Sequence, residues 1–215
     1  TVSGNTALAG GGGIDNQGTL TMADCIVSGN TAGWFGGGIS NYDGTVNMVD
    51  CTVSGNTAEF GGGIDNQGTL TMEDCIVSGN TAGWGGGGFF NYNDGAVNLI
   101  GCTVSDNTAD FGGGIDNQGT LTMEDCIVSG NSANNGGGGG IDNSGTLIME
   151  ICTITDNTAD YGGNAVGNGG GIQNQGILTL NDCTISGNTA DNGGGIQNQG
   201  ILTLNDCTVS DNTAV

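Results

Sequence analysis

The side chains of this sequence best suited to chemistry are thiols and carboxylates, and both recur at nearly fixed spacing. Cysteine returns eight times, usually after 24 to 27 residues, at Cys25, Cys51, Cys75, Cys102, Cys126, Cys152, Cys183 and Cys207. Zinc sites need closely spaced cysteine pairs or histidine, and the sequence has neither. If the units stack, neighbouring cysteines fall within the Cα range of a disulfide, so bridges between units are one interpretation. Parallel strands hold side chains side by side, which favours free thiols that fill an apolar core.

Aspartate forms two columns with the same period. Six aspartates directly precede a cysteine, namely Asp24, Asp50, Asp74, Asp125, Asp182 and Asp206. Four others follow a GGGI motif, namely Asp15, Asp65, Asp116 and Asp142. Like charges one strand apart repel by about 1 kcal/mol even in water, and cations from the medium, Ca²⁺ above all, would relieve this repulsion. The six aspartates before cysteine are therefore weak candidates for Ca²⁺ or diffuse cation binding, with a solvated acidic surface as the alternative, and no other cofactor is expected.

Paired carboxylates can also hydrolyse a glycosidic bond, provided that the two groups lie in different environments. In this sequence each aspartate is repeated from unit to unit, which predicts equal environments. The chain has no Lys, Arg or His to bind an anionic substrate or to activate a hydroxyl group. We therefore expect no catalytic residue and no enzymatic activity. The two breaks in the repeat, at 92–95 and 163–169, are where a site would be sought.

Composition limits the partners of the chain. Its 215 residues carry a net charge of −22 without a single Lys or Arg. Nucleic acids and anionic membranes attract proteins through Lys and Arg, so we expect neither to bind. No apolar run of the sequence is long enough to cross a bilayer, so no direct membrane insertion is expected. The expected partners are other copies of the chain or a ligand on a host or other cell surface.

Three short strands per unit are expected to position these columns. One strand precedes cysteine and contains Leu70 and Met72, one follows it and contains Val77, and one is centred on GGGI and contains Ile64. All three alternate apolar and polar residues with the period of two that is typical of β-strands, and the 48 glycines exclude helix. A unit this small cannot bury its own apolar face, so each strand must pair with its counterpart one unit along. We predict an all-β parallel β-solenoid of about eight coils, about 4.8 Å apart, which forms a single domain over 1–215. Both termini lie within a repeat, so we expect a segment of a longer array or a filament subunit.

Two asparagine columns are predicted to form inward ladders. The first follows the GGGI strand and comprises Asn16, Asn41, Asn66, Asn91, Asn117, Asn143, Asn174 and Asn198. The second lies in the SGNTA motif and comprises Asn5, Asn30, Asn56, Asn80, Asn107, Asn131, Asn157, Asn188 and Asn212. Asparagine suits tight turns, and stacked amides can donate to one another from coil to coil. Both columns are therefore interpreted as structural.

An aromatic column follows the NTA motif. It comprises Trp34, Phe60, Trp84, Phe111 and Tyr161, while Tyr42, Phe90 and Tyr92 lie at a different corner. These rings can stack on sugars, cover the glycine corner or contact a neighbouring rod. Covering the corner is the favoured interpretation, and the first five residues are the candidate interface.

The combination of GGGI-x-N-x-G with C-(T/I)-(V/I)-S-G-N-T-A resembles the right-handed parallel β-helix repeats of bacterial surface proteins. It is most similar to the polymorphic outer-membrane-protein type, whose passenger regions carry GGA(I/L/V) and FxxN motifs. GGGI or GGGF stands in place of the first motif, and SGNTA occupies a position comparable to the second. The resemblance implies right-handed winding, secretion to the cell surface and service as a stalk or adhesin passenger, and it carries over no catalytic residue. The alternatives are a filament subunit that stacks end to end through exposed coil edges and, less favoured, a carbohydrate-binding or polysaccharide-degrading β-helix.

Overall fold

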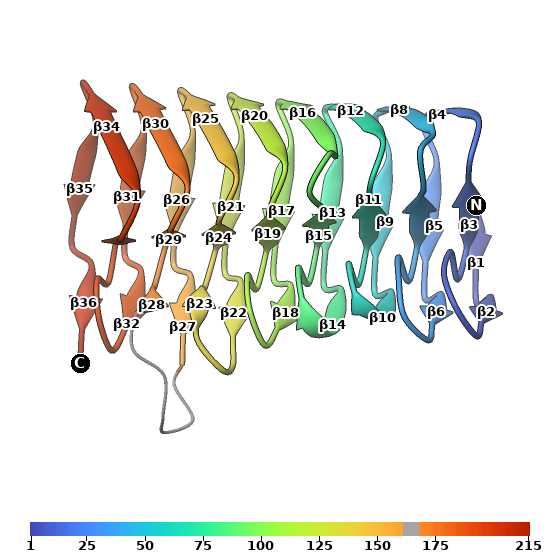
Figure 1. Cartoon of the computed structure of the whole chain (residues 1–215), viewed down its shortest axis with the longest axis horizontal. Helices are drawn as coiled ribbons and strands as arrows, with labels where there is room; N and C mark the ends of the chain where they lie inside the picture. The colour runs from blue at the N-terminus through green and yellow to red at the C-terminus, as the bar shows by residue number, and fades with distance from the viewer. Residues whose placement is uncertain (161–167) are drawn as a thin grey trace.

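The computed structural model describes residues 1–160 and 168–215, and these form a parallel β-solenoid. Figure 1 shows the coils side by side along the long axis, with the N-terminus at one end and the C-terminus at the other. Every coil passes through four sheets, A to D, and each strand pairs in parallel with the equivalent strand of the next coil. The all-β solenoid of about eight coils is thereby confirmed. Within the described ranges there is no helix with the length and hydrophobicity of a membrane span.

Sheets A and B are the two nine-stranded sheets. Sheet A consists of β1 (Val2–Ser3), β5 (Ile26–Ser28), β9 (Thr52–Ser54), β13 (Ile76–Ser78), β17 (Thr103–Ser105), β21 (Ile127–Ser129), β26 (Thr153–Thr155), β31 (Thr184–Ser186) and β35 (Thr208–Ser210). Sheet B consists of β2 (Thr6–Ala7), β6 (Thr31–Ala32), β10 (Thr57–Phe60), β14 (Thr81–Gly85), β18 (Thr108–Ala109), β22 (Ser132–Ala133), β27 (Thr158–Ala159), β32 (Thr189–Ala190) and β36 (Thr213–Ala214).

Sheets C and D have eight strands each. Sheet C consists of β3 (Ile14–Asn16), β7 (Ile39–Asn41), β11 (Ile64–Asn66), β15 (Phe89–Asn91), β19 (Ile115–Asn117), β24 (Ile141–Asn143), β29 (Ile172–Asn174) and β33 (Ile196–Asn198). Sheet D consists of β4 (Thr19–Ala23), β8 (Thr45–Val49), β12 (Thr69–Glu73), β16 (Ala96–Ile100), β20 (Thr120–Glu124), β25 (Thr146–Glu150), β30 (Ile177–Asn181) and β34 (Ile201–Asn205). A small additional sheet pairs β23 (Gly137–Gly138) with β28 (Asn168–Gly169).

The expectation of three strands per coil is wrong, because the NTA segment forms a fourth. It is only two residues long in most coils, too short to show an alternating pattern in the sequence. Its backbone nevertheless continues the pairing between coils, as where the amide of Thr57 donates to the carbonyl of Asn30 at 2.9 Å. The residue after the ladder asparagine is therefore strand rather than corner.

The core consists of apolar side chains at equivalent positions, stacked coil on coil. Leu121 and Met123 of sheet D, Val128 of sheet A and Ile115 of sheet C are all at most 1% exposed. The register of the sheets pairs each apolar residue of the core with an apolar residue of the next coil, since Leu121 pairs with Val97 on one side and Leu147 on the other. Burying one such side chain stabilises the fold by about 1.5–3 kcal/mol.

Both asparagine ladders form as predicted and lie inside the solenoid. In the ladder that starts at Asn16, each Nδ2 donates to the Oδ1 of the next coil at 2.7–3.0 Å. In the ladder that starts at Asn5, the same bond measures 2.9–3.0 Å. Each amide also satisfies backbone carbonyls at a corner, as where Asn80 Nδ2 donates to the carbonyl of Val53 at 3.0 Å. The ladders thus replace water at buried turns.

All eight cysteines are free thiols, in agreement with the favoured interpretation. The thiol of Cys51 donates to the carbonyl of Val49 at 3.2 Å, and its backbone amide donates to the sulfur of Cys75 at 3.3 Å. The contact with the neighbouring thiol of Cys102 and burial together raise the pKa of the Cys75 thiol well above its usual range. The cysteine side chains therefore pack in the apolar core and also donate weak hydrogen bonds through their thiol groups.

Candidate functional site

The outer face of sheet C carries the chemistry of this solenoid. In each strand the first and third residues face the core and the central residue faces outward, as in Ile115–Asn117. The central residues are Asp15, Ser40, Asp65, Phe90, Asp116, Asp142, Gln173 and Gln197. Although they point away from the core, Asp65 is 0% exposed and Asp116 only 9% exposed. Another part of each coil must therefore cover them.

The cover comes from the corner between sheets B and C, displaced by one coil. Phe35, Phe60, Gly85 and Phe111 pair in register along this corner. Phe60 packs on Phe90 of the next coil, with ring centroids 5.2 Å apart. A β-carbon on Gly85 would lie 2.5 Å from Oδ2 of Asp116, so that carboxyl group lies directly against the glycine.

By the same displacement of one coil, the corner that carries Phe35 corresponds to the strand of Asp65, and this carboxyl group is completely buried. Two neighbouring hollows result, one on each side of Phe90 along the solenoid.

The first, the aromatic hollow, has a volume of about 430 Å³ and is lined by Phe35, Tyr42, Phe60, Gln67, Phe90 and Tyr92. Successive rings are close, since the Phe35 and Phe60 centroids lie 5.6 Å apart and those of Phe90 and Tyr92 lie 5.7 Å apart. Gln67 is the one amide in this lining, and its Nε2 donates to Oδ2 of Asp65 at 3.5 Å.

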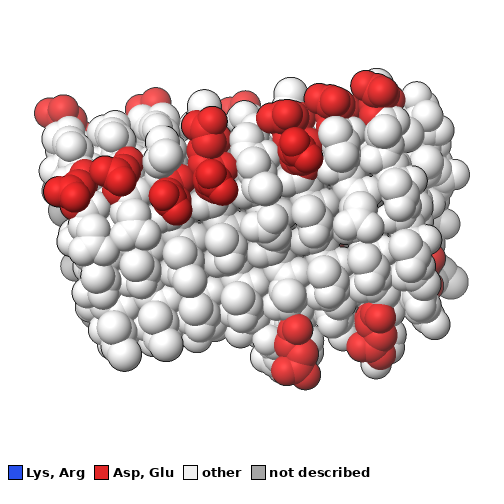
Figure 2. All heavy atoms as spheres, turned by 90° about the horizontal axis from the view of Figure 1, so that it is seen from above, with Lys and Arg blue, Asp and Glu red and all other residues white. Residues whose placement is uncertain are grey.

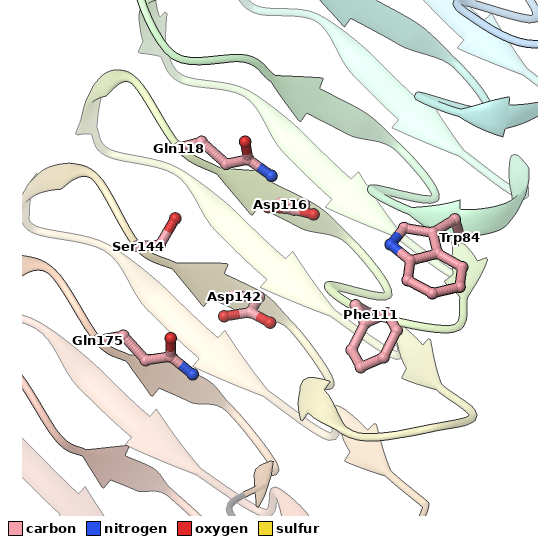
Figure 3. Close-up of a pocket in the computed structure, with 7 residues that line it drawn as sticks. All are labelled: Trp84, Phe111, Asp116, Gln118, Asp142, Ser144 and Gln175. Carbon is pink, nitrogen blue, oxygen red and sulfur yellow. The ribbon is translucent and has the colours of Figure 1, made fainter.

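The second, the aspartate hollow, has a volume of about 250 Å³ and is lined by Trp84, Phe111, Asp116, Gln118, Asp142, Ser144 and Gln175. Figure 3 shows Asp116 and Asp142 on neighbouring strands, with Trp84 and Phe111 on one side and Gln118, Ser144 and Gln175 on the other. The two aspartates are paired in register across β19 and β24. Aromatic faces beside carboxyl and amide groups are a combination that suits a polar ligand with apolar ring faces.

Burial raises the pKa of three carboxyl groups on this face. Desolvation raises the pKa of Asp65 to about 7, against the opposing hydrogen bond from Gln67. Desolvation also raises the pKa of Asp142 to about 6. For Asp116, desolvation and then the charge of Asp142 raise the pKa well above its usual range, although the Gln118 hydrogen bond lowers it. Burial thus favours the neutral form of both neighbouring carboxyl groups, and a neutral carboxyl group can donate a hydrogen bond to a bound hydroxyl or carbonyl group.

Comparison with known proteins places this geometry in a family. A model of the right handed beta helix region matches residues 87–215, which is more than half of the chain. The chain belongs to the right-handed β-helix family. Comparison with curated proteins gives no match. Among solved structures, pectate lyase Pel9A is similar at 15% identity over 97% of this chain and 69% of that chain, with a TM-score of 0.44.

The expectation that this β-helix is not an enzyme is contradicted, because the similar structure is a lyase, and we withdraw it. Its premise was also wrong. The aspartates after GGGI do not share one environment, since Asp15 is exposed while Asp65 is fully buried. At a TM-score of 0.44 the likeness itself carries no argument for a particular activity.

The six aspartates before cysteine lie elsewhere on the β-helix, at a tight turn after sheet D. Each adopts a left-handed backbone, with φ between +50° and +51°. Aspartate tolerates this conformation better than most residues, which gives the column a structural reason. Figure 2 shows acidic side chains in a band along one long edge, beside a broad surface with little charge. No group of three or more His, Cys, Asp or Glu suited to a metal ion occurs in the described ranges, and Ca²⁺ binding stays a prediction.

The predicted aromatic column is corrected by the structure. Trp34, Phe60 and Trp84 all lie two residues after the alanine of an NTA motif, so the sequence aligns them in one column. In the structure, the register between β10 and β14 shifts after Ala58, and Phe60 pairs with Gly85 instead of Trp84. Phe60 and Phe111 therefore belong to the covering corner, whereas Trp34 and Trp84 lie one position away and are 57% and 51% exposed. Tyr161 lies outside the described residues.

Several residues of the two hollows were missed in the sequence, namely Phe35, Gln67, Gln118, Ser144 and Gln175. A signal for four of them existed, because each lies two residues after a central residue of sheet C and so faces the same side. Phe35 had no such signal, since its coil has one more residue between NTA and the corner than the coil of Phe60.

Proposed function

We propose that this β-helix is a rigid extracellular rod, a stalk or passenger segment of a bacterial surface adhesin, with its ligand-contacting surface on the outer face of sheet C. The observation that carries the proposal is the continuous parallel pairing of sheets A and B through nine strands each, together with the two continuous asparagine ladders. Each coil contacts only its neighbours, and strands of all four sheets pair from coil to coil, so the coils are held together as one continuous stack. Eight coils at about 4.8 Å extend over about 38 Å.

Charge and surface composition support the same function. A net charge of −22 without Lys or Arg keeps rods soluble and apart. The exposed aromatic rings concentrate beside sheet C, where the two hollows lie. Aromatic groups in a hollow are typical of contact surfaces for ligands. The repeat resemblance to adhesin passengers gives the expected location, the cell surface.

The purified chain tests the rod directly by electron microscopy and sedimentation. Isolated short rods agree with the proposal, whereas long uniform fibres would support the filament subunit instead. Binding of the labelled chain to cells then tests the surface. Trp84→Ser should weaken binding, and Ile127→Thr should not, because Ile127 lies on sheet A next to Thr103 and Thr153 in register. Equal binding by both variants would refute a contact role for the sheet C face.

A second candidate is binding or cleavage of a neutral polysaccharide in the aspartate hollow. It is favoured by one observation, the pairing of Asp116 with Asp142 between aromatic and amide side chains, where burial raises the pKa of both carboxyl groups. Incubation with neutral polysaccharides, followed by an assay for new reducing ends, tests cleavage. Loss of products with Asp142→Asn, but not with Asp15→Asn, would support it, and no products from either the parent chain or the variants would refute it.

A further inference from the structure

We propose that the aromatic hollow binds a small quaternary ammonium compound of the choline type. The lining is unusual for a chain in which aromatic residues are only 5% of the sequence, because five of its six side chains are aromatic. Ring faces attract cations through their quadrupoles, and the attraction strengthens when the cation is desolvated. The proposal concerns direct binding to the purified chain and does not depend on the adhesin function.

The rings form a continuous wall rather than separate contacts. Phe35, Phe60 and Phe90 follow one another with centroid distances of 5.6 and 5.2 Å, and Tyr92 continues the run at 5.7 Å. Tyr42 and Tyr92 are 51% and 42% exposed, so their outer edges meet solvent at the opening. The volume of about 430 Å³ leaves room for a methylated ammonium group between them.

Beneath this wall lies a carboxyl group that lacks a full set of partners. Asp65 is 0% exposed, its Oδ2 accepts the bond from Gln67, and its Oδ1 has no hydrogen-bond partner among the described residues. Asp65 is the register partner of Phe90, which lines the hollow. A cation among the rings would offset the cost of keeping this carboxylate ionised in a buried place.

The charge around the opening has the same sign. Tyr42, Gln67 and Tyr92 also line an adjoining hollow of about 200 Å³, whose other walls are Asp43, Asn93 and Asp94. The chain has no Lys or Arg of its own to occupy the rings. The cation must therefore come from outside the chain.

The chemistry of the lining selects the type of cation. A lysine ammonium or an arginine guanidinium group brings several N–H donors that need acceptors when they are desolvated. The side chains that line the aromatic hollow offer few acceptors, namely the amide oxygen of Gln67 and the hydroxyl groups of Tyr42 and Tyr92. A trimethylammonium group has no N–H donor and is satisfied by ring faces alone. A phosphate attached to it, as in a phospholipid headgroup, would be repelled by the acidic surroundings.

Titration of the purified full chain with choline, followed by calorimetry or NMR, tests the site. The matched probe is 3,3-dimethylbutan-1-ol, which has the same shape without the charge. We expect saturable binding of choline and binding of the neutral alcohol at least about tenfold weaker. Equal binding of the two probes, or no saturation with choline, would overturn the proposal.

Variants locate the site, with circular dichroism as the check on folding. Tyr42→Leu changes a half-exposed ring and should weaken choline binding about tenfold, and Asp65→Asn should weaken it to a similar extent. Ile127→Thr, on sheet A, should leave it unchanged, and an equal loss with this variant would refute the location. Tighter binding of lysine ethyl ester than of choline would overturn the quaternary ammonium assignment. Co-sedimentation with phosphatidylcholine vesicles would overturn the small-molecule source.

Discussion

Ile151 occupies a backbone conformation that its side chain disfavours, and replacing it with asparagine is expected to stabilise the chain. It lies at the turn before cysteine, where six coils have aspartate and one has Gly101, and its φ is +55°. A left-handed conformation costs an L-residue about 1–2 kcal/mol, and a branched β-carbon makes it worse, whereas asparagine tolerates it. The side chain of Ile151 is 54% exposed, so little apolar burial is lost with it.

The expected gain in the free energy of unfolding is therefore about 1–2 kcal/mol, which corresponds to a Tm higher by about 2–4 °C per kcal/mol for a chain of this length. Thermal unfolding followed by circular dichroism at constant pH and salt measures it. Asparagine is preferred to aspartate, because a carboxylate at 151 would face Asp125 and Asp182 in the adjoining coils.

Two further variants separate backbone strain from other effects. Ile151→Val keeps the branched β-carbon and should leave the Tm unchanged. Asp125→Ile, one coil away at φ +51°, should lower the Tm by an amount similar to the gain at Ile151. If Ile151→Asn left the Tm equal to that of the parent, or lowered it, the assignment of strain to this turn would be refuted.

Three other predictions concern buried polar groups. The folded pKa of Asp65 is about 7 against an unfolded value of 3.8, so the folded chain holds more protons between these values and its stability falls as pH rises through that window. The free energy of unfolding should be higher at pH 5 than at pH 8 by on the order of 2 kcal/mol from Asp65 alone, with a correspondingly higher Tm at pH 5. Asp65→Asn should raise the Tm at pH 8 and flatten the pH dependence. Asn117→Ala should destabilise the chain by about 2–4 kcal/mol in denaturant titrations, because it leaves buried ladder partners unsatisfied, whereas Asn198→Ala at an exposed position should cost much less. Thiol titration of the native chain should show fast reaction at Cys25 and Cys207, which are partly exposed, and slow reaction at the six buried cysteines; uniform rates would contradict the free, buried column.

The architecture could be predicted from the sequence because it depends on contacts between residues at equivalent positions of neighbouring coils. Leu70, for example, lies between Val46 and Val97, and Asn66 bonds to Asn91, all at the phase that alignment on cysteine gives. Period and identity together then determine strand, register and inward face. The fourth strand was missed because two residues are too few to show a period.

The candidate site could not be predicted because it depends on contacts between residues at non-equivalent positions of neighbouring coils. Whether a sheet C aspartate is solvated depends on the corner residue one coil earlier, which lies on another sheet and after a segment of variable length. The corner of Phe35 corresponds to the fully buried Asp65, and Gly85 leaves Asp116 against the backbone. The register shift after Ala58 changes which residue does the covering, and no count along one coil reveals it.

The difference between these two kinds of contact explains how a regular repeat gives the same residue type different environments in different coils. The inward columns must stay constant, since a single unmatched asparagine leaves its neighbours in two coils without partners. The corner residues carry no such constraint, because each covers a different strand from its own. Exchange of one corner residue for another therefore changes the burial, and with it the pKa, of carboxyl groups that occupy the same strand position in different coils. Asp65 and Asp116 share the same strand position, yet one lies beneath an aromatic wall while the other forms an acid pair with Asp142. The local environments on sheet C of this β-helix thus depend on its corners, while its inward columns specify the solenoid that holds them.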